Sequence, residues 1–150
     1  MKKKRILLTG DDGYNSLGTR LLIHYLKETY ELAIAATRDQ QSGVGGHGSF
    51  DTRGTWEEVN VDGVPGFWVS GYPVDAVECA QGYFKKKFDI VISGINWGAN
   101  VSGSVVTSGT IAAALRALFV QLTPQGIAIS WQTPRTDGIT SIREMRISTV

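Results

Sequence analysis

Short apolar runs alternate with stretches of helical periodicity along most of the chain. Four of these runs end abruptly in polar residues, as strands buried on both faces of a sheet do. The predicted strands are residues 6–8, 31–36, 89–92 and 126–130. Between them, apolar residues recur at the spacing of an amphipathic helix. The predicted helices are residues 16–30, 73–87 and 108–121.

A β-hairpin is predicted in the middle of the chain, where residues 56–61 and 66–69 flank the turn-forming pair Asp62-Gly63. Elsewhere strands and helices alternate, which implies parallel strands joined by right-handed crossovers. This order predicts the α/β class, with a doubly wound, mostly parallel, Rossmann-like sheet and a small β-hairpin insertion. We expect residues 1–130 to form this domain, and we predict no regular element in residues 131–150.

The loops that follow the predicted strands are the first place to look for chemistry, because doubly wound sheets bind ligands beyond the carboxyl ends of their strands. Three such loops are polar and contain glycine, at residues 9–13, 37–47 and 93–100. Since the strands are predicted to be parallel, we expect these loops to converge at one edge of the sheet.

Asp11 and Asp12 are adjacent acidic residues directly after the first predicted strand. Their repulsion costs stability unless a proton or a cation intervenes, although Asp-Asp-Gly is also an ordinary turn sequence. Ser42 and Asn96, in the other two loops, add neutral oxygen atoms. Such a set suits a hard divalent cation and leaves coordination positions open, as a metal hydrolase requires. We therefore predict a site for one divalent metal ion, Mg²⁺ or Mn²⁺, held by Asp11, Asp12, Ser42 and Asn96.

A phosphate site is predicted where Ser108, Gly109 and Thr110 open the last helix, because free backbone N–H groups at a helix start attract anions. The same residues are also consistent with ordinary capping by Thr107 or Ser108. The two interpretations are compatible, since a capped helix end can still bind phosphate.

Residues 43–48 match the G-x-G-x-x-G pattern of dinucleotide-binding loops. No helix is predicted directly after them, which argues against a nicotinamide or flavin site. We instead expect Gly43 to let the loop backbone approach a bound phosphate. His47 is interpreted as a polar loop residue, with a contact to phosphate or to the leaving group as the alternative.

The 150 residues include 15 basic and 14 acidic side chains, for a net charge of +1. This balance shows no electrostatic footprint of nucleic-acid binding, so we expect no nucleic-acid partner. No apolar run approaches the roughly 20 residues of a membrane span. The apolar residues 6–8 that follow the basic start are too few for a signal peptide. We therefore expect a cytoplasmic protein with no membrane partner.

Five segments, in this order along the chain, resemble motifs of the SurE family of survival proteins. They are residues 6–14, 41–45, 71–77, 93–100 and 108–110, within a resemblance that runs from residue 4 to residue 130. The resemblance implies a SurE-type fold and the hydrolysis of nucleoside 5′- or 3′-monophosphates, and of short polyphosphate, by a cytoplasmic homodimer or tetramer. It also implies the same four metal ligands, and a phosphate pocket lined by Asn100, Ser108, Gly109 and Thr110.

Two departures from the family pattern bear on activity. The family usually has Asn at the position of Gly10, and it continues into a longer C-terminal segment where this chain has residues 131–150. A SurE-like protein that binds metal and nucleotide with weak or no turnover therefore stays open as an alternative. For the enzyme, we expect direct attack by water, which Asp11 or Asp12 orients or deprotonates.

Two further classes lack residues that their chemistry requires. A haloacid-type phosphatase would use Asp12 as its nucleophile and would need a second Asp at the position of Tyr14. A receiver-like signalling domain would need an Asp after a middle strand and a Lys after the last strand, where this chain has Ser93 and Ser130.

Overall fold

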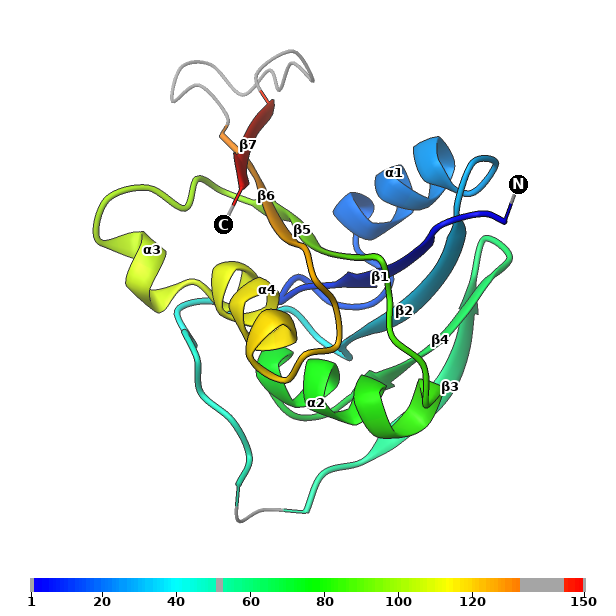
Figure 1. Ribbon diagram of the computed structural model, residues 1–150. Helices are drawn as coiled ribbons and strands as arrows, with labels where there is room; N and C mark the ends of the chain where they lie inside the picture. The colour runs from blue at the N-terminus through cyan, green and yellow to red at the C-terminus, as the bar shows by residue number, and fades with distance from the viewer. Residues whose placement is uncertain (1, 51–52, 133–144, 150) are drawn as a thin grey trace.

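The computed structural model describes residues 2–50, 53–132 and 145–149 (Figure 1). Its strands form a seven-stranded sheet in the order β3-β4-β2-β1-β5-β6-β7. The strands are β1 (Arg5–Thr9), β2 (Glu31–Thr37), β3 (Trp56–Val61), β4 (Val64–Val69), β5 (Ile90–Trp97), β6 (Gly126–Trp131) and β7 (Met145–Thr149). The helices are α1 (Leu17–Leu26), α2 (Pro73–Phe84), α3 (Ser104–Thr107) and α4 (Gly109–Phe119).

The sheet is parallel in its interior and antiparallel at both edges. Strands β4, β2, β1, β5 and β6 run parallel, whereas β3 and β7 pair antiparallel with their neighbours. Helix α1 covers one face, and α2 and α4 cover the other. The predicted doubly wound α/β fold is therefore confirmed. The predicted hairpin, β3 and β4, belongs to the main sheet, because β4 pairs with β2.

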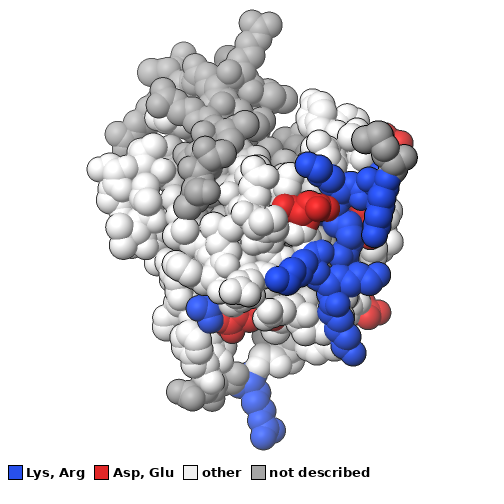
Figure 2. All heavy atoms as spheres, in the orientation of Figure 1, with Lys and Arg blue, Asp and Glu red and all other residues white. Residues whose placement is uncertain are grey.

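Basic side chains are unevenly distributed over this fold. Figure 2 shows Lys and Arg gathered on one side of the molecule. A depression of about 650 Å³ at the amino ends of the strands is lined by Lys2, Lys3, Lys4, Arg5, Lys86 and Lys87, together with Glu31 and Asp89. The net charge of +1 is therefore an average over an uneven surface. The loops predicted to carry the chemistry lie at the opposite edge, at the carboxyl ends of the strands.

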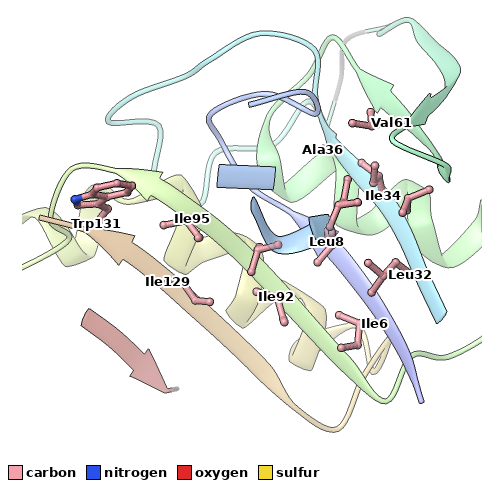
Figure 3. Close-up of a cluster of buried hydrophobic side chains, with 13 residues drawn as sticks. Ile6, Leu8, Leu32, Ile34, Ala36, Val61, Ile92, Ile95, Ile129 and Trp131 are labelled. Carbon is pink, nitrogen blue, oxygen red and sulfur yellow. The ribbon is translucent and has the colours of Figure 1, made fainter. Parts of the chain in front are cut away.

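Successive side chains of the inner strands enter two separate cores, because neighbouring residues of a strand point to opposite faces. Ile6 and Leu8 pack under α1 in the cluster of Figure 3, whereas Leu7 packs under α2 and α4. All three side chains are at most 2% exposed. Burial on both faces explains why β1 is a continuous apolar run and lacks a polar alternation.

Strand β5 extends to Trp97, so the prediction of a loop from residue 93 onward is wrong for residues 93–97. Pairing with β6 is irregular between Ser93 and Asn96 and then resumes, with Asn96 opposite Ser130. Small and polar residues in this stretch do not favour a strand by themselves. The neighbouring strand β6 supplies the pairing that overrides this weak preference.

Other boundaries also differ from the predictions. Helix α1 ends at Leu26 and α2 ends at Phe84, where Lys85 turns the chain with a left-handed φ of 50°. Helix α3 was not predicted, and neither was β7, which pairs with β6 within the segment where no element was expected. Among the described residues, no helix has the length and apolar character that crossing a membrane would require.

Helix α1 lies so close to β5 that a Cβ atom at Gly18 would overlap the carbonyl oxygen of Ile95. We expect Gly18→Ala to lower the free energy of unfolding by about 1–3 kcal/mol, because α1 must shift away from the sheet. Urea denaturation would measure this. The matched control is Gly82→Ala in α2, where a Cβ would meet no atom of the described part of the chain within 4 Å. It is expected to stabilise by up to about 1 kcal/mol. Equal effects of the two substitutions would contradict the close packing.

Candidate functional site

The acidic turn after β1 is hydrogen-bonded to both neighbouring segments at the carboxyl edge of the sheet. The backbone carbonyl of Asp11 accepts from the amide of Gln41, with 2.6 Å between nitrogen and oxygen. The Oδ2 atom of Asp12 accepts from the backbone amide of Trp97 at 2.7 Å. Gln41 precedes Ser42 and Trp97 follows Asn96, so the structure brings the segments of all four predicted metal ligands together. The expected convergence at one sheet edge is confirmed.

Asp11 is a buried carboxylic acid, with only 5% of its surface exposed. Its Oδ1 atom accepts a hydrogen bond of 2.5 Å from the hydroxyl of Thr110. Burial is the main cause that raises the pKa of Asp11, the charge of Asp12 adds to the rise, and the hydrogen bond from Thr110 opposes it. The negative charge of Asp11 is therefore costly in the protein alone, and a nearby cation would offset that cost.

The start of α4 lies directly against the acidic turn. Ser108 caps the helix by accepting a hydrogen bond from the amide of Ile111 at 3.1 Å. A Cβ atom at Gly109 would lie 2.9 Å from Oδ2 of Asp11 and 3.0 Å from Cγ2 of Val44. Glycine at this position therefore lets the helix end, the carboxylate and the loop after β2 approach one another closely. The predicted phosphate end of the helix therefore lies against Asp11, one of the four predicted metal ligands.

The loop between β2 and β3, residues 38–55, is fastened at two points to the helices beside it. The amide of Gly45 donates to the carbonyl of Thr107 at 2.8 Å, and the amide of Ser49 donates to Oδ1 of Asp75 at 2.8 Å. Between the acidic turn and the first of these points, Ser42 and Gly43 stay exposed. Gly43 has a left-handed φ of 70°, and a Cβ atom at this position would have no atom of the described residues within 4 Å. The loop thus presents an open backbone beside the site.

The two asparagines within residues 93–100 are held by different hydrogen bonds. Asn96 lies within β5, and its side-chain Nδ2 donates to the carbonyl of Gly98 at 2.8 Å, which orients the amide and leaves its Oδ1 atom as the one that can face a cation. Asn100 lies in the following loop, and its Nδ2 donates to the hydroxyl of Ser130 at 2.8 Å. Both side chains are partly exposed.

The chemistry of these donors fits a divalent metal ion. Asp11 and Asp12 each use one carboxylate oxygen in a hydrogen bond with the protein, and each has a second oxygen. In the part of the chain that the structure describes, no three His, Cys, Asp or Glu side chains lie close enough together to hold a metal. A cation here would therefore need the neutral oxygens of Ser42 and Asn96 as well, which hard cations accept.

Sequence reasoning missed the residues that hold these loops in place. Trp97 and Gln41 act through backbone amides, which leave no signal in the side-chain pattern. Asp75 could have been found, because an acidic residue in the first turn of a helix is a capping signal. It accepts from the amide of Tyr72 at 2.7 Å as well as from Ser49. His47 is exposed and packs its ring edge-on against Tyr72 at 4.4 Å.

The comparisons of this chain with known proteins all lead to one family. A family model described as survival protein SurE matches residues 6–149. The 5′-nucleotidase SurE of Methanopyrus kandleri is 44% identical over 114 residues, which cover 75% of this chain and 44% of that protein. The 5′-nucleotidase SurE of Chloroflexus aggregans is 37% identical over 145 residues, which cover 95% of this chain and 56% of that protein.

A solved structure is also similar to this fold. The crystal structure of the SurE protein from Aquifex aeolicus matches with a TM-score of 0.75 and 29% sequence identity, over 89% of this chain and 53% of that chain. The chain spans about half the length of the curated relatives it matches.

Asp75 joins the loop between β2 and β3 to the start of α2, and this contact can be tested by substitution. Asp75→Asn replaces one acceptor oxygen with a donor that faces a backbone N–H group. We expect the free energy of unfolding to fall by about 1.5–3 kcal/mol, as for a lost hydrogen bond to a charged group. Asp39→Asn is the control in the same loop, since its carboxylate is 70% exposed and pairs with the neighbouring Arg38. Its effect should stay below about 1 kcal/mol. Similar losses in both variants would contradict the role of Asp75.

Proposed function

This chain belongs to the SurE family, and on that basis we propose that it is a metal-dependent phosphatase that hydrolyses nucleoside 5′- and 3′-monophosphates to nucleoside and phosphate. The observation that carries the proposal is the contact of the buried Asp11 carboxylate with Thr110 and Gly109 at the start of α4. In this contact, oxygen atoms that would bind a cation lie beside a helix end that would bind an anion. The 5′ activity is the one that the names of the relatives carry.

Asp11, Asp12, Ser42 and Asn96 would hold one divalent ion, Mg²⁺ or Mn²⁺. When bound, this ion supplies a positive charge that neutralises phosphate and polarises its bond to the leaving group. The raised pKa of Asp11, which reflects a charge that the protein alone stabilises poorly, supports a cation at this position.

The phosphate would bind at the start of α4. Ser108, Gly109 and Thr110 provide hydroxyl and backbone N–H donors there, and the positive end of the helix dipole favours an anion. Gly43 lets the opposite loop approach without a side chain, and Asn100 would complete the pocket. These fixed donors would stabilise the charge that spreads over the phosphoryl oxygens in the transition state.

Asp11 or Asp12 would orient or deprotonate the water that attacks phosphorus. The new P–O bond forms as the bond from phosphorus to the nucleoside oxygen breaks, and the nucleoside leaves with a proton from solvent or from a site residue. As in the family, the working protein would be a cytoplasmic homodimer or tetramer, with no nucleic-acid or membrane partner.

Binding of metal and nucleotide with little turnover is the second candidate. Gly10 favours it, because a glycine offers no side-chain amide beside the acidic pair. A Cβ at Gly10 would lie 3.1 Å from the backbone nitrogen of Gly94, and its φ is 151°. Measuring turnover beside nucleotide affinity separates the two candidates. A protein of the second kind would bind the nucleotide but release little or no phosphate.

The activity itself is tested by phosphate release from several nucleoside monophosphates with Mg²⁺ or Mn²⁺. We expect hydrolysis that stops with EDTA and returns on adding metal. Asp11→Asn should lower kcat/KM by about 100-fold or more, because a charged ligand is lost at the reacting centre. Asp39→Asn, which removes an exposed carboxylate, should leave kcat/KM within about twofold. Unchanged turnover in Asp11→Asn would rule out the mechanism.

Metal binding is tested separately by thermal unfolding. We expect Mn²⁺ or Mg²⁺ to raise the melting temperature of the wild type, because a ligand that binds only the folded state stabilises it. Asp11→Asn should lose this rise. Without metal it should melt no lower than the wild type, because it no longer buries a charge. A metal-induced rise of the same size in Asp11→Asn would show that the cation binds elsewhere.

A further inference from the structure

The amino edge of the sheet, opposite the proposed active site, carries a concentrated positive charge. Six of the seven lysines of the chain lie there, in the segment before β1 and in the turn between α2 and β5. All six are exposed, on the side of the molecule where Figure 2 shows basic side chains gathered. These residues form the lysine surface: Lys2, Lys3, Lys4, Lys85, Lys86 and Lys87.

The lysine surface is concave and elongated. Its larger depression is the one of about 650 Å³ at the amino ends of the strands. A second depression, of about 280 Å³, is lined by Lys85, Lys86 and Lys87 together with Gln81 and Gln121. Lys86 and Lys87 line both depressions, so the two adjoin. A hollow of this form suits an extended chain better than a flat surface.

Arg5 fastens the segments that carry the lysines to one another. Its backbone amide donates to Oδ2 of Asp89 at 2.7 Å, and its guanidinium donates to the carbonyl of Lys87 at 2.7 Å. The same guanidinium pairs with Glu31 at 3.2 Å and lies over the ring of Phe88, 4.6 Å from the ring centroid. The backbone under the lysine surface is therefore held in place before any partner binds.

The positive charge of the lysine surface is largely uncompensated. Glu31 and Asp89 are the acidic residues that line it, and Arg5 already engages both. Among the described residues, none of the six lysines forms an ion pair. Lys3 donates to a neutral group, the backbone carbonyl of Glu28, at 2.6 Å. Like charges at such proximity repel one another, and a bound anionic partner would relieve the repulsion.

The lining of the two depressions argues against a nucleic acid and against a membrane as this partner. No aromatic side chain is among the described lining residues, whereas single-stranded nucleic acids stack their bases on aromatic rings. A membrane-binding face presents exposed apolar side chains. The apolar residue of the described lining, Leu122, is only 1% exposed.

The same lining also offers acceptor atoms, which favour a polypeptide. Glu31 and Asp89 each use one carboxylate oxygen with Arg5 and keep a second one. Gln81 donates through Nε2 to a backbone carbonyl at 3.0 Å, which leaves its Oε1 atom as an acceptor. An acidic peptide has carboxylates for the lysines and backbone N–H groups for these acceptors, whereas a DNA backbone has no N–H or O–H donors.

We propose that the lysine surface binds an acidic segment of a partner protein. The segment lies extended along both depressions, and its Asp and Glu side chains pair with the lysines. Its backbone N–H groups donate to the carboxylate and amide oxygens of the lining. Binding is electrostatic, so it weakens as the salt concentration rises. The inference is independent of the proposed phosphatase activity, because the surface lies at the opposite edge of the sheet.

The probe for this surface is a fluorescein-labelled oligoglutamate of about ten residues, which spans roughly 33 Å when extended. Fluorescence anisotropy measures its affinity for the full chain, and an oligoglutamine of equal length is the uncharged reference. The double variant Lys86→Gln/Lys87→Gln removes two charges that both depressions share. The matched control, Arg20→Gln/Lys27→Gln, also removes two exposed charges, but these side chains contact Asp62 and lie outside the lysine surface.

We expect the wild type to bind oligoglutamate and not oligoglutamine. Lys86→Gln/Lys87→Gln should lower the affinity about tenfold, as expected for the loss of two exposed ion pairs. The control should stay within about twofold. A second pair, Lys2→Gln/Lys4→Gln, repeats the test at the other end of the surface, and circular dichroism checks that every variant is folded. Nucleotide hydrolysis should be unchanged in both lysine variants.

Four outcomes would overturn the inference. The first is no binding of oligoglutamate by the wild type at low salt. The second is an equal loss in the lysine variants and in the control, which would show an effect of net charge alone. The third is tighter binding, through the same lysines, of a single-stranded RNA or of vesicles that contain phosphatidylserine. The fourth is self-association that the lysine variants abolish, which would assign the surface to a second copy of the chain.

Discussion

The buried carboxylate of Asp11 is the constraint around which the carboxyl edge of the sheet is built. A charge that is 5% exposed needs partners, and the protein supplies only some of them: the hydroxyl of Thr110 and the first turn of α4. Gly109 lets that turn come close enough to act. The remaining requirement for positive charge is what makes this position suitable for a cation. Burial of Asp11 thus makes its charge unfavourable in the protein alone, and the same burial would favour the binding of a cation beside it.

Rigidity around this carboxylate comes mainly from the backbone. The amides of Gln41 and Trp97 hold the acidic turn, and the amide of Gly45 holds the loop after β2 to the segment before α4. Two of the predicted metal ligands, Ser42 and Asn96, are therefore positioned without being enclosed, whereas Asp11 is buried. Ser42 is exposed, and Asn96 is partly exposed. The proposed binding and release of a phosphate ester would need this combination of fixed ligands and an open side.

Helix α4 contacts different parts of the protein through its inner side, its first turn and its outer side. Its inner side consists of small residues such as Ala113 and Ala117, which are fully buried against the sheet and α2. Its first turn meets Asp11, and its outer side lines an apolar cleft. Small inner residues let the helix lie close to β5 and β6, so that its start reaches the edge where the strands end. One helix thereby connects the sheet to the proposed phosphate site.

The sequence by itself determined the α/β class, the inner strands and the edge of the sheet at which the segments of the predicted ligands meet. Burial on both faces demands continuous apolar runs, and strand–helix alternation forces parallel strands whose ends coincide. It also predicted the candidate ligands Asp11, Asp12, Ser42 and Asn96, because each lies in a loop predicted to follow such a run.

Only the tertiary structure decided the rest: that β5 continues to Trp97, that β7 adds to the sheet, and that Asp75 holds the loop after β2. Each of these features is a hydrogen bond or strand pairing between segments far apart in the chain. The bond from Thr110 to Asp11 spans 99 residues. No local pattern encodes such partners, since their geometry exists only after the sheet has brought them together.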